Sequence, residues 1–180
     1  MSDDEAGFEL NSDEPTAPGE RLRAAPDGDG SAPGGTRGGL GGVVDKWIAG
    51  DEKAISASAK RGFDLFNNRA NCVACHSGWN FTDDSFHDIG LESTDIGRGR
   101  QVPNVKPMQH AFKAPTLRNV VERAPYMHDG SARNLYSVVE HYDNGFVKRP
   151  SLTTEVYELN LTQAEKHDLV EFMKTLSSPD

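Results

Sequence analysis

Long apolar runs and positive charge are both scarce in this chain. No run approaches the roughly eighteen apolar residues that a membrane-spanning helix needs, so no membrane span is expected. Asp and Glu number 28 against 19 Lys and Arg, which gives a formal net charge of −9. A nucleic-acid surface needs clustered Lys and Arg to neutralise phosphates, so this charge argues against a nucleic-acid partner.

The N-terminal residues 1–42 lack both apolar periodicity and the features of a secretory signal. They contain nine acidic residues and three Arg, together with ten of the 18 Gly and four of the ten Pro. Such a segment buries too little apolar area to offset its ordering entropy. We therefore expect a disordered, acidic, Gly/Pro-rich leader at 1–42 and a folded domain at 43–180. The leader has no basic n-region and no apolar h-region.

Strand-like alternation of apolar and polar residues is nearly absent. Helical periodicity predicts helices at 56–67 and 131–142, with a short one at 116–121. The sequence TQAE at 162–165 is a capping box ahead of an apolar stripe, and it predicts a C-terminal helix. Frequent Gly, Asp and Pro between 77 and 115 predict a long loop. The expected fold class is all-α with long irregular loops.

The two cysteines of the chain form the run Cys72-Val73-Ala74-Cys75-His76. At this spacing two thiols can become thioethers on the vinyl groups of one porphyrin, and the adjacent imidazole can bind the iron from the proximal side. A structural zinc site needs a second pair of ligands, and a thioredoxin-like pair needs a βαβ setting; the sequence shows neither. The run predicts one covalent haem c, with His76 as proximal iron ligand.

The ligand at the second axial position of the iron determines the function of a haem. A strong ligand gives an electron carrier, whereas an open position lets peroxide or oxygen bind the iron. The sequence offers Met108, Met127, His128, His141 and Tyr142 as candidates for this position. Met127 and Tyr142 stand out, because they flank a predicted helix whose apolar face should meet the haem.

Several runs in the sequence resemble the C-terminal haem domain of the bacterial di-haem cytochrome c peroxidase family, and most of all its MauG-like, methylamine-utilisation branch. The resemblance spans about residues 43–176. It rests on RGFDLF at 61–66, CVACHSG at 72–78, FKAPTLRN at 112–119, APYMHDG at 124–130, VVEHYDNG at 138–145 and the closing segment 161–176.

The resemblance implies a cytochrome c-like fold in which the first and last helices cross near the haem. It implies that Tyr142 is the distal iron ligand, since classical peroxidases have Met there and the MauG-like branch has Tyr. Met127 and Met108 stay as alternatives. A phenolate is a hard anionic donor that stabilises ferric iron, so Tyr142 predicts a lower reduction potential than Met.

Two further sites follow from the resemblance. Family members bind calcium partly through backbone carbonyls at the positions of Arg123 and Pro125, and carbonyl ligation tolerates changes of side chain. Arg118 is a candidate partner for a haem propionate, although a surface Arg at a helix start is an equal alternative.

The family carries its peroxidatic haem in a second, N-terminal domain, whereas this chain has one Cys-x-x-Cys-His run. The resemblance therefore implies an electron-transfer domain of a di-haem peroxidase-type oxidoreductase, whose partner is a second haem domain or a redox protein. By itself the chain lacks the peroxidatic haem. The alternatives are a stand-alone monohaem cytochrome without peroxidase turnover, and a haem-free remnant that keeps the fold. Because c-type haem is usually attached after export, a periplasmic or otherwise exported location is expected.

Overall fold

The computed structural model describes residues 42–178, so the predicted leader falls outside the described residues except for its last position. None of the helices in this part of the chain has both the length and the apolar character needed to cross a membrane. The helices and strands are α2 (Val43–Ile48), α3 (Ala57–Asn67), β1 (Phe86–His87), β2 (Phe112–Lys113), α4 (Leu135–Asn144) and α5 (Gln163–Lys174). The 3₁₀ turns are η1 (Cys72–Ala74), η2 (Arg98–Arg100), η3 (Lys106–Met108) and η4 (Val120–Arg123).

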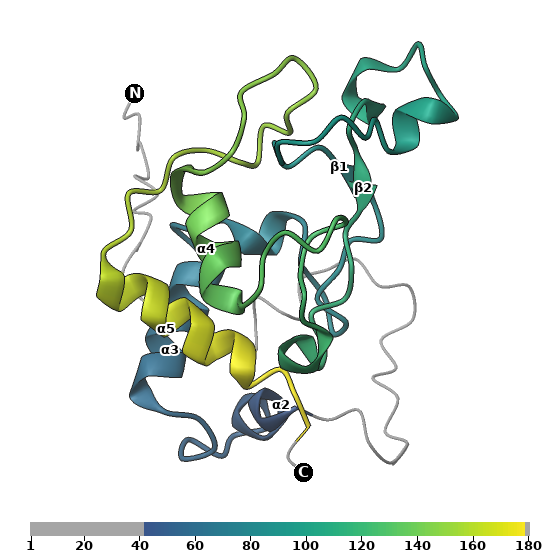
Figure 1. Ribbon diagram of the computed structural model, residues 1–180. Coiled ribbons are helices and arrows are strands. Elements are labelled where there is room, and N and C mark those ends of the chain that lie inside the picture. The colour runs from purple at the N-terminus through teal and green to yellow at the C-terminus, as the bar shows by residue number, and fades with distance from the viewer. Residues whose placement is uncertain (1–41, 179–180) are drawn as a thin grey trace, which may run out of the picture.

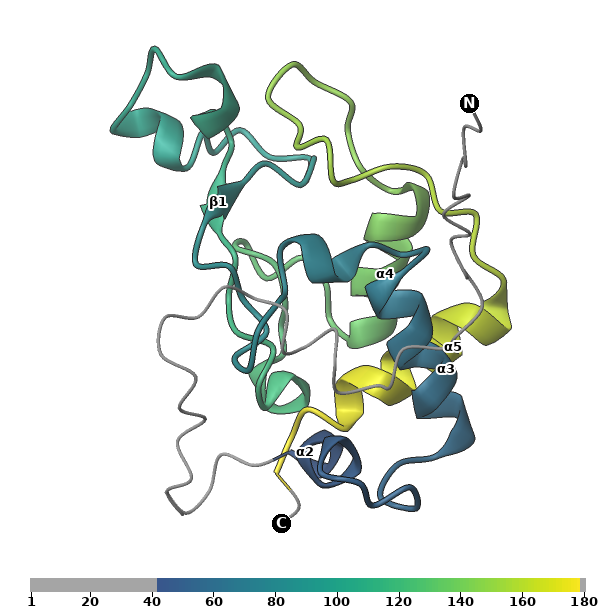
Figure 2. The ribbon, with the colours of Figure 1, turned by 180° about the vertical axis from the view of Figure 1, so that it is seen from behind.

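Helices α3 and α5 cross and make the most extensive contact between elements of the described chain (Figures 1 and 2). The crossing depends on Gly62 of α3, which has no side chain to separate the helices. A Cβ at this position would lie 1.9 Å from the carbonyl oxygen of Asp168 and 2.8 Å from the Cβ of Phe172, both in α5. Two backbones can approach this closely only where one of them carries glycine.

Aromatic side chains form the centre of the core beside this crossing. Phe63 and Phe66 of α3, Phe172 of α5, Trp47 of α2 and Phe81 of the long loop are all buried. Their rings meet edge to face, with centroids 5.0–6.3 Å apart, and this geometry stabilises aromatic pairs beyond the area that they bury. The core therefore joins the crossed helices to the loop that follows the cysteine run.

The helix boundaries follow local capping chemistry. The predicted capping box is confirmed: the Thr162 hydroxyl accepts from the backbone N–H of Glu165, whose carboxylate accepts from the backbone N–H of Thr162. The helix predicted from 131 begins only at Leu135, because the side chain of Asn134 caps it. The prediction of a helix at 116–121 is wrong. Asn119 has a left-handed conformation (φ 56°), and only the 3₁₀ turn η4 follows it.

The all-α expectation also needs correction, because the predominantly helical fold includes a small antiparallel sheet. Phe86 pairs with Lys113, and His87 pairs with Phe112. Two-residue strands are too short for alternation to show in the sequence, so periodicity could not reveal them. Apart from this pairing and the turns η2 and η3, the segment 77–115 is irregular, as predicted.

Candidate haem site

The cysteine run lies in a tight turn directly after α3. Asn71 adopts a left-handed conformation (φ 53°) that opens the 3₁₀ turn η1, and the N–H of His76 donates to the carbonyl of Cys72 over 2.9 Å. Both cysteines are half-buried and free. The turn thus brings two thiols and one imidazole to the wall of one cavity, and their roles in holding a haem stay a prediction.

His76 is oriented by the loop that follows it. Its Nδ1 lies 3.0 Å from the carbonyl oxygen of Phe81. A carbonyl can only accept, so Nδ1 carries the proton and Nε2 keeps its lone pair. Burial lowers the pKa of His76, and the hydrogen bond to Phe81 offsets this only in part. The imidazole is therefore neutral, with its tautomer fixed in the way that metal-binding histidines require.

The cavity beside this turn has a volume of about 420 Å³ and mainly apolar walls. Helices α3 and α5 contribute Phe66, Leu169 and Met173 to the walls. Helix α4 contributes Val138, Val139 and Tyr142, and the cysteine turn contributes Cys72, Cys75 and His76. A flat apolar group with one metal at its centre fits this donor set, because it can meet two thiols, a nitrogen donor and a phenol within one apolar space.

Burial keeps the two thiols protonated. It raises the pKa of Cys72 to about 12, and burial together with the charges of Asp83 and Glu155 raises the pKa of Cys75 to about 11. Reactive redox cysteines have depressed pKa values, because the thiolate is their nucleophile. Neither thiol therefore has the depressed pKa of a thioredoxin-like dithiol.

The candidates for the second axial position differ in their surroundings. Tyr142 and Met127 both line the cavity, whereas Met108 is not among the described residues that do so. His128 also lines the cavity, but its ring stacks on Phe112 with centroids 3.6 Å apart. The Nε2 of His141 lies 3.0 Å from the carbonyl oxygen of Ile89. The structure thus brings Tyr142 and Met127 together with His76, and the assignment of the ligand stays a prediction.

Arg118 is already paired. Its guanidinium donates to both carboxylate oxygens of Asp45 over 2.7 and 2.8 Å and to the carbonyl of Trp79 over 2.8 Å. It is not among the described residues that line the cavity, so its contact with a propionate stays a prediction. Arg123 and Pro125, the predicted calcium positions, do line the cavity, and the Ala124–Pro125 peptide is cis.

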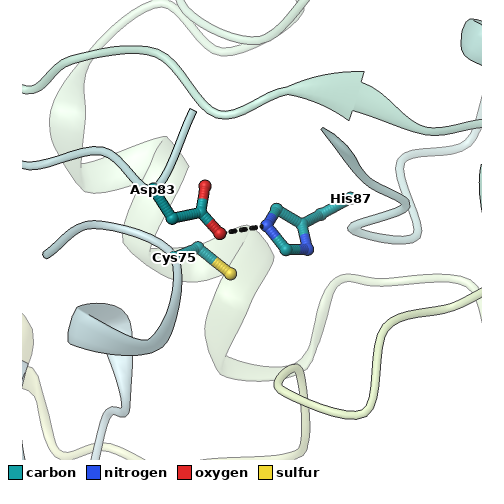
Figure 3. A group of neighbouring side chains, drawn as sticks. All are labelled: Cys75, Asp83 and His87. Atoms are coloured by element: carbon teal, nitrogen blue, oxygen red, sulfur yellow. Dashed lines mark hydrogen bonds and ion pairs between the residues drawn. The ribbon is translucent and has the colours of Figure 1, made fainter. Parts of the chain in front are cut away.

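A trio of side chains beside the cysteine turn was not found from the sequence. The Cys75 sulfur and single ligand atoms of Asp83 and His87 all lie within 4.8 Å of one another, and Figure 3 shows the three pointing toward a common centre. His87 Nε2 and the Asp83 carboxylate are 2.7 Å apart. These are ligand types that transition metals use, but the haem motif assigns the Cys75 sulfur to a thioether. No sequence pattern joins Asp83 to His87, since Asp83 lies in the loop and His87 in the two-residue strand β1, which periodicity could not reveal.

A family model for cytochrome c matches residues 59–177. The methylamine utilization protein MauG of Methylophilus methylotrophus is 56% identical over 135 residues, which are 73% of this chain and 40% of that protein. The cytochrome c551 peroxidase of Nitrosomonas europaea is 32% identical over 142 residues, covering 76% of this chain and 39% of that protein. The chain thus spans about two fifths of the length of these curated relatives.

Solved structures agree with this relationship. The crystal structure of a MauG-like protein associated with microbial copper homeostasis superposes with a TM-score of 0.66 at 27% identity, covering 78% of this chain and 52% of that one. The diheme peroxidase BthA from Burkholderia thailandensis shares the fold with a TM-score of 0.65 at 20% identity, over 77% of this chain and 46% of that one. The resemblance to di-haem peroxidases and MauG is confirmed, and the chain belongs to the cytochrome c family.

Proposed function

We propose that this chain binds one covalent haem c and transfers electrons as the C-terminal haem domain of a di-haem cytochrome c peroxidase or MauG-like oxidoreductase. One observation carries the proposal. The two thiols, the oriented imidazole of His76 and the phenol of Tyr142 line the same apolar cavity. The relatives that are named as cytochrome c peroxidases support the oxidoreductase class.

Each side chain of the cysteine turn has a separate role in this proposal. Cys72 and Cys75 would hold the haem through two thioethers, since each S–H group can add across one vinyl group without a leaving group. His76 presents the lone pair of Nε2, because its Nδ1 proton is used by the Phe81 carbonyl. The bound haem supplies a one-electron redox couple, and the covalent bonds keep it in the protein through repeated electron transfer.

Tyr142 is the proposed distal ligand. Burial raises the pKa of its phenol, so the Oη of Tyr142 holds its proton in the protein alone. As an iron ligand it would give up that proton and become a hard, anionic donor. Such a donor favours the ferric state and gives a lower potential than methionine sulfur would.

The cavity walls favour electron transfer over substrate turnover at this haem. Phe66, Leu169 and Met173 are buried core residues that also line the cavity. Apolar walls exclude water from the macrocycle, and an electron can cross them without contact between the iron and a substrate. We therefore propose that peroxide chemistry takes place at a second haem domain, and that this domain or another redox protein is the partner of the chain.

We further propose that the domain works in the periplasm or another exported compartment, since thioether attachment of haem usually follows export. A calcium ion bound partly by the carbonyls of Arg123 and Pro125 is also part of the proposal. Among residues 42–178, no backbone N–H donates to either of these carbonyl oxygens. Carbonyl oxygens that accept no backbone hydrogen bond are suited to binding a hard cation such as calcium.

The axial assignment can be tested in the haem-loaded protein with Tyr142→Phe, with Tyr136→Phe on the same helix as control. We expect Tyr142→Phe to abolish a phenolate-to-iron charge-transfer band and to raise the midpoint potential, whereas Tyr136→Phe should change neither. An unchanged spectrum and potential in Tyr142→Phe would instead favour Met127 or an open position.

Peroxide turnover tests the proposed division of labour. The haem-loaded chain should reduce hydrogen peroxide only weakly, measured as oxidation of a reduced cytochrome c. Robust turnover by the chain alone would contradict its assignment as the electron-transferring half. If turnover by the chain alone is weak, adding a second haem domain distinguishes the two remaining functions. Turnover should increase if the chain is a domain of a larger enzyme, and should not change if it is a stand-alone electron carrier.

A further inference from the structure

The segment 146–159, called the strap here, connects α4 to α5 without forming a helix or a strand. It is the yellow-green loop that leaves the end of α4 and returns to α5 in Figures 1 and 2. A segment of this length without regular hydrogen bonds needs other contacts to be ordered.

Asp88 anchors the first part of the strap, residues 146–153. It is almost fully buried, with 1% of its surface exposed. Its carboxylate accepts two hydrogen bonds from the guanidinium of Arg149, over 2.6 and 2.7 Å, and one from the Ser151 hydroxyl over 2.7 Å. Its carbonyl accepts from the N–H of Thr153 over 2.9 Å. Burial acts to raise the pKa of Asp88, but the bonds from Arg149 and Ser151 outweigh it, so the carboxylate is ionised.

The residues after Asp88 connect this ion pair to the haem cavity. The N–H of Val147 donates to the carbonyl of Gly90 over 2.7 Å, and a Cβ on Gly90 would lie 2.9 Å from the Cβ of Phe146. Ile89, between Asp88 and Gly90, lines the cavity, and its carbonyl lies 3.0 Å from the Nε2 of His141. The strap, the loop at 88–90 and the α4 turn that carries Tyr142 are therefore linked by direct contacts.

The far part of the strap covers the cysteine edge of the site. Glu155, Val156, Tyr157 and Leu159 line a smaller cavity of about 60 Å³. Cys72, Cys75, His76, Ile89 and Tyr142 line the same space. This far part has its own anchors: Asn71 donates to Glu155, the Tyr157 hydroxyl donates to the carbonyl of Arg69, and the N–H of Leu159 donates to the carbonyl of Asp143.

We propose that Asp88 is a positioning residue that keeps the first part of the strap, 146–153, packed on the loop at 88–90 and so on the wall of Ile89 and Tyr142, and thereby limits the access of water and small ligands to the haem. This inference deepens the proposed function and rests on it. The physical reason is that the attraction between Arg149 and Asp88 offsets the free-energy cost of burying each charge. Removing one charge leaves the other buried and unpaired, which is more costly than the pair itself.

The test compares Asp88→Asn with Asp168→Asn in the haem-loaded protein. Asp168 is a matched control, because its buried carboxylate also accepts two hydrogen bonds from one guanidinium, that of Arg61, and one from a hydroxyl, that of Ser58. This control pair joins α3 to α5 and does not contact the strap. Both variants replace one buried carboxylate. Because the side chain of Arg61 is 64% exposed and that of Arg149 is 17% exposed, the free energy of unfolding is measured for each variant by urea unfolding, and local effects are compared after this global difference is subtracted.

Two readouts are measured on each variant: amide hydrogen exchange across 146–153, and the rate at which cyanide binds the ferric haem when Tyr142→Phe is also present, so that Tyr142 does not occupy the iron. In Asp88→Asn we expect both to increase at least about tenfold, which corresponds to about 1.4 kcal/mol in the opening equilibrium. In Asp168→Asn neither should change by that amount. Ser151→Ala removes one hydrogen bond to Asp88 and no charge, so it should increase hydrogen exchange and cyanide binding by a smaller factor. It replaces Asp88→Asn in the test if that variant does not fold.

Equal effects of the two Asn variants would overturn the inference, as would faster exchange in the strap with unchanged cyanide binding. Either result, obtained on wild-type protein that carries covalent haem, would leave the proposed function intact. A wild-type protein without covalent haem would contradict the proposed function itself, and this inference with it.

Discussion

The substitution Gly62→Ala tests how the helix crossing shapes the site. An added Cβ would lie 1.9 Å from the Asp168 carbonyl oxygen, whereas ordinary contacts begin near 3.4 Å. The helices would have to separate by about 1.5 Å, the difference between these distances. Because the obstacle is backbone and not a flexible side chain, the cost should lie near the upper end of the ~1–3 kcal/mol typical of overpacking.

Alanine also favours the helical state over glycine by up to about 1 kcal/mol, which offsets part of this cost. We therefore expect a net loss of about 2 kcal/mol in the free energy of unfolding. The assay is urea unfolding of the haem-loaded protein, followed by far-ultraviolet circular dichroism. Ala164→Gly, at an exposed position of α5, measures the Ala–Gly difference without a steric contact and should cost about 1 kcal/mol or less.

The site should respond as well, because Phe66 of α3 and Leu169 and Met173 of α5 line the haem cavity. Separated helices would admit water between these walls, so the haem absorption spectrum of Gly62→Ala should shift while that of Ala164→Gly should not. A Gly62→Ala variant as stable as wild type would refute the argument that the close approach of α3 and α5 determines the packing at this site.

Three other predictions concern stability and the paired charges. Thr162→Ala removes the capping box of α5 and should cost about 1 kcal/mol in urea unfolding. The hydrogen bonds from Arg61 lower the pKa of Asp168 although burial opposes them, so the ionised form adds stability that is lost as the pH falls through the lowered pKa. Unfolding free energy measured between about pH 5 and pH 3 should therefore fall less in Asp168→Asn than in wild type. If Arg118 pairs only with Asp45, Arg118→Gln should reduce stability without changing the midpoint potential; a changed potential would support its contact with a propionate.

Features that depend on neighbouring residues could be predicted from the sequence. The spacing of Cys72, Cys75 and His76 predicts that the three act together on one haem, and the structure places all three at one cavity. The capping box predicts the start of α5. In both cases the responsible atoms are within four positions of each other in the chain. Family resemblance added Tyr142, which no local pattern distinguishes from Met127.

Features that depend on distant residues could not be predicted in this way. Asp88 and Arg149 are 61 positions apart, and Arg118 and Asp45 are 73 positions apart. In the sequence each is one charged residue among many, and only the fold brings the pairs together. For the same reason the pairing of Arg118 with Asp45 could not be read from the sequence, and its contact with a propionate stays a prediction.

Covalent attachment of the haem is the central claim, and intact mass under denaturing conditions tests it most directly. The chain would be expressed with a c-type haem maturation system, boiled in detergent and analysed by mass spectrometry and haem stain, beside a variant with both Cys72→Ala and Cys75→Ala. We predict a mass increase of one haem in wild type and none in the double variant. Wild-type protein that loses its haem stain on boiling would contradict the claim.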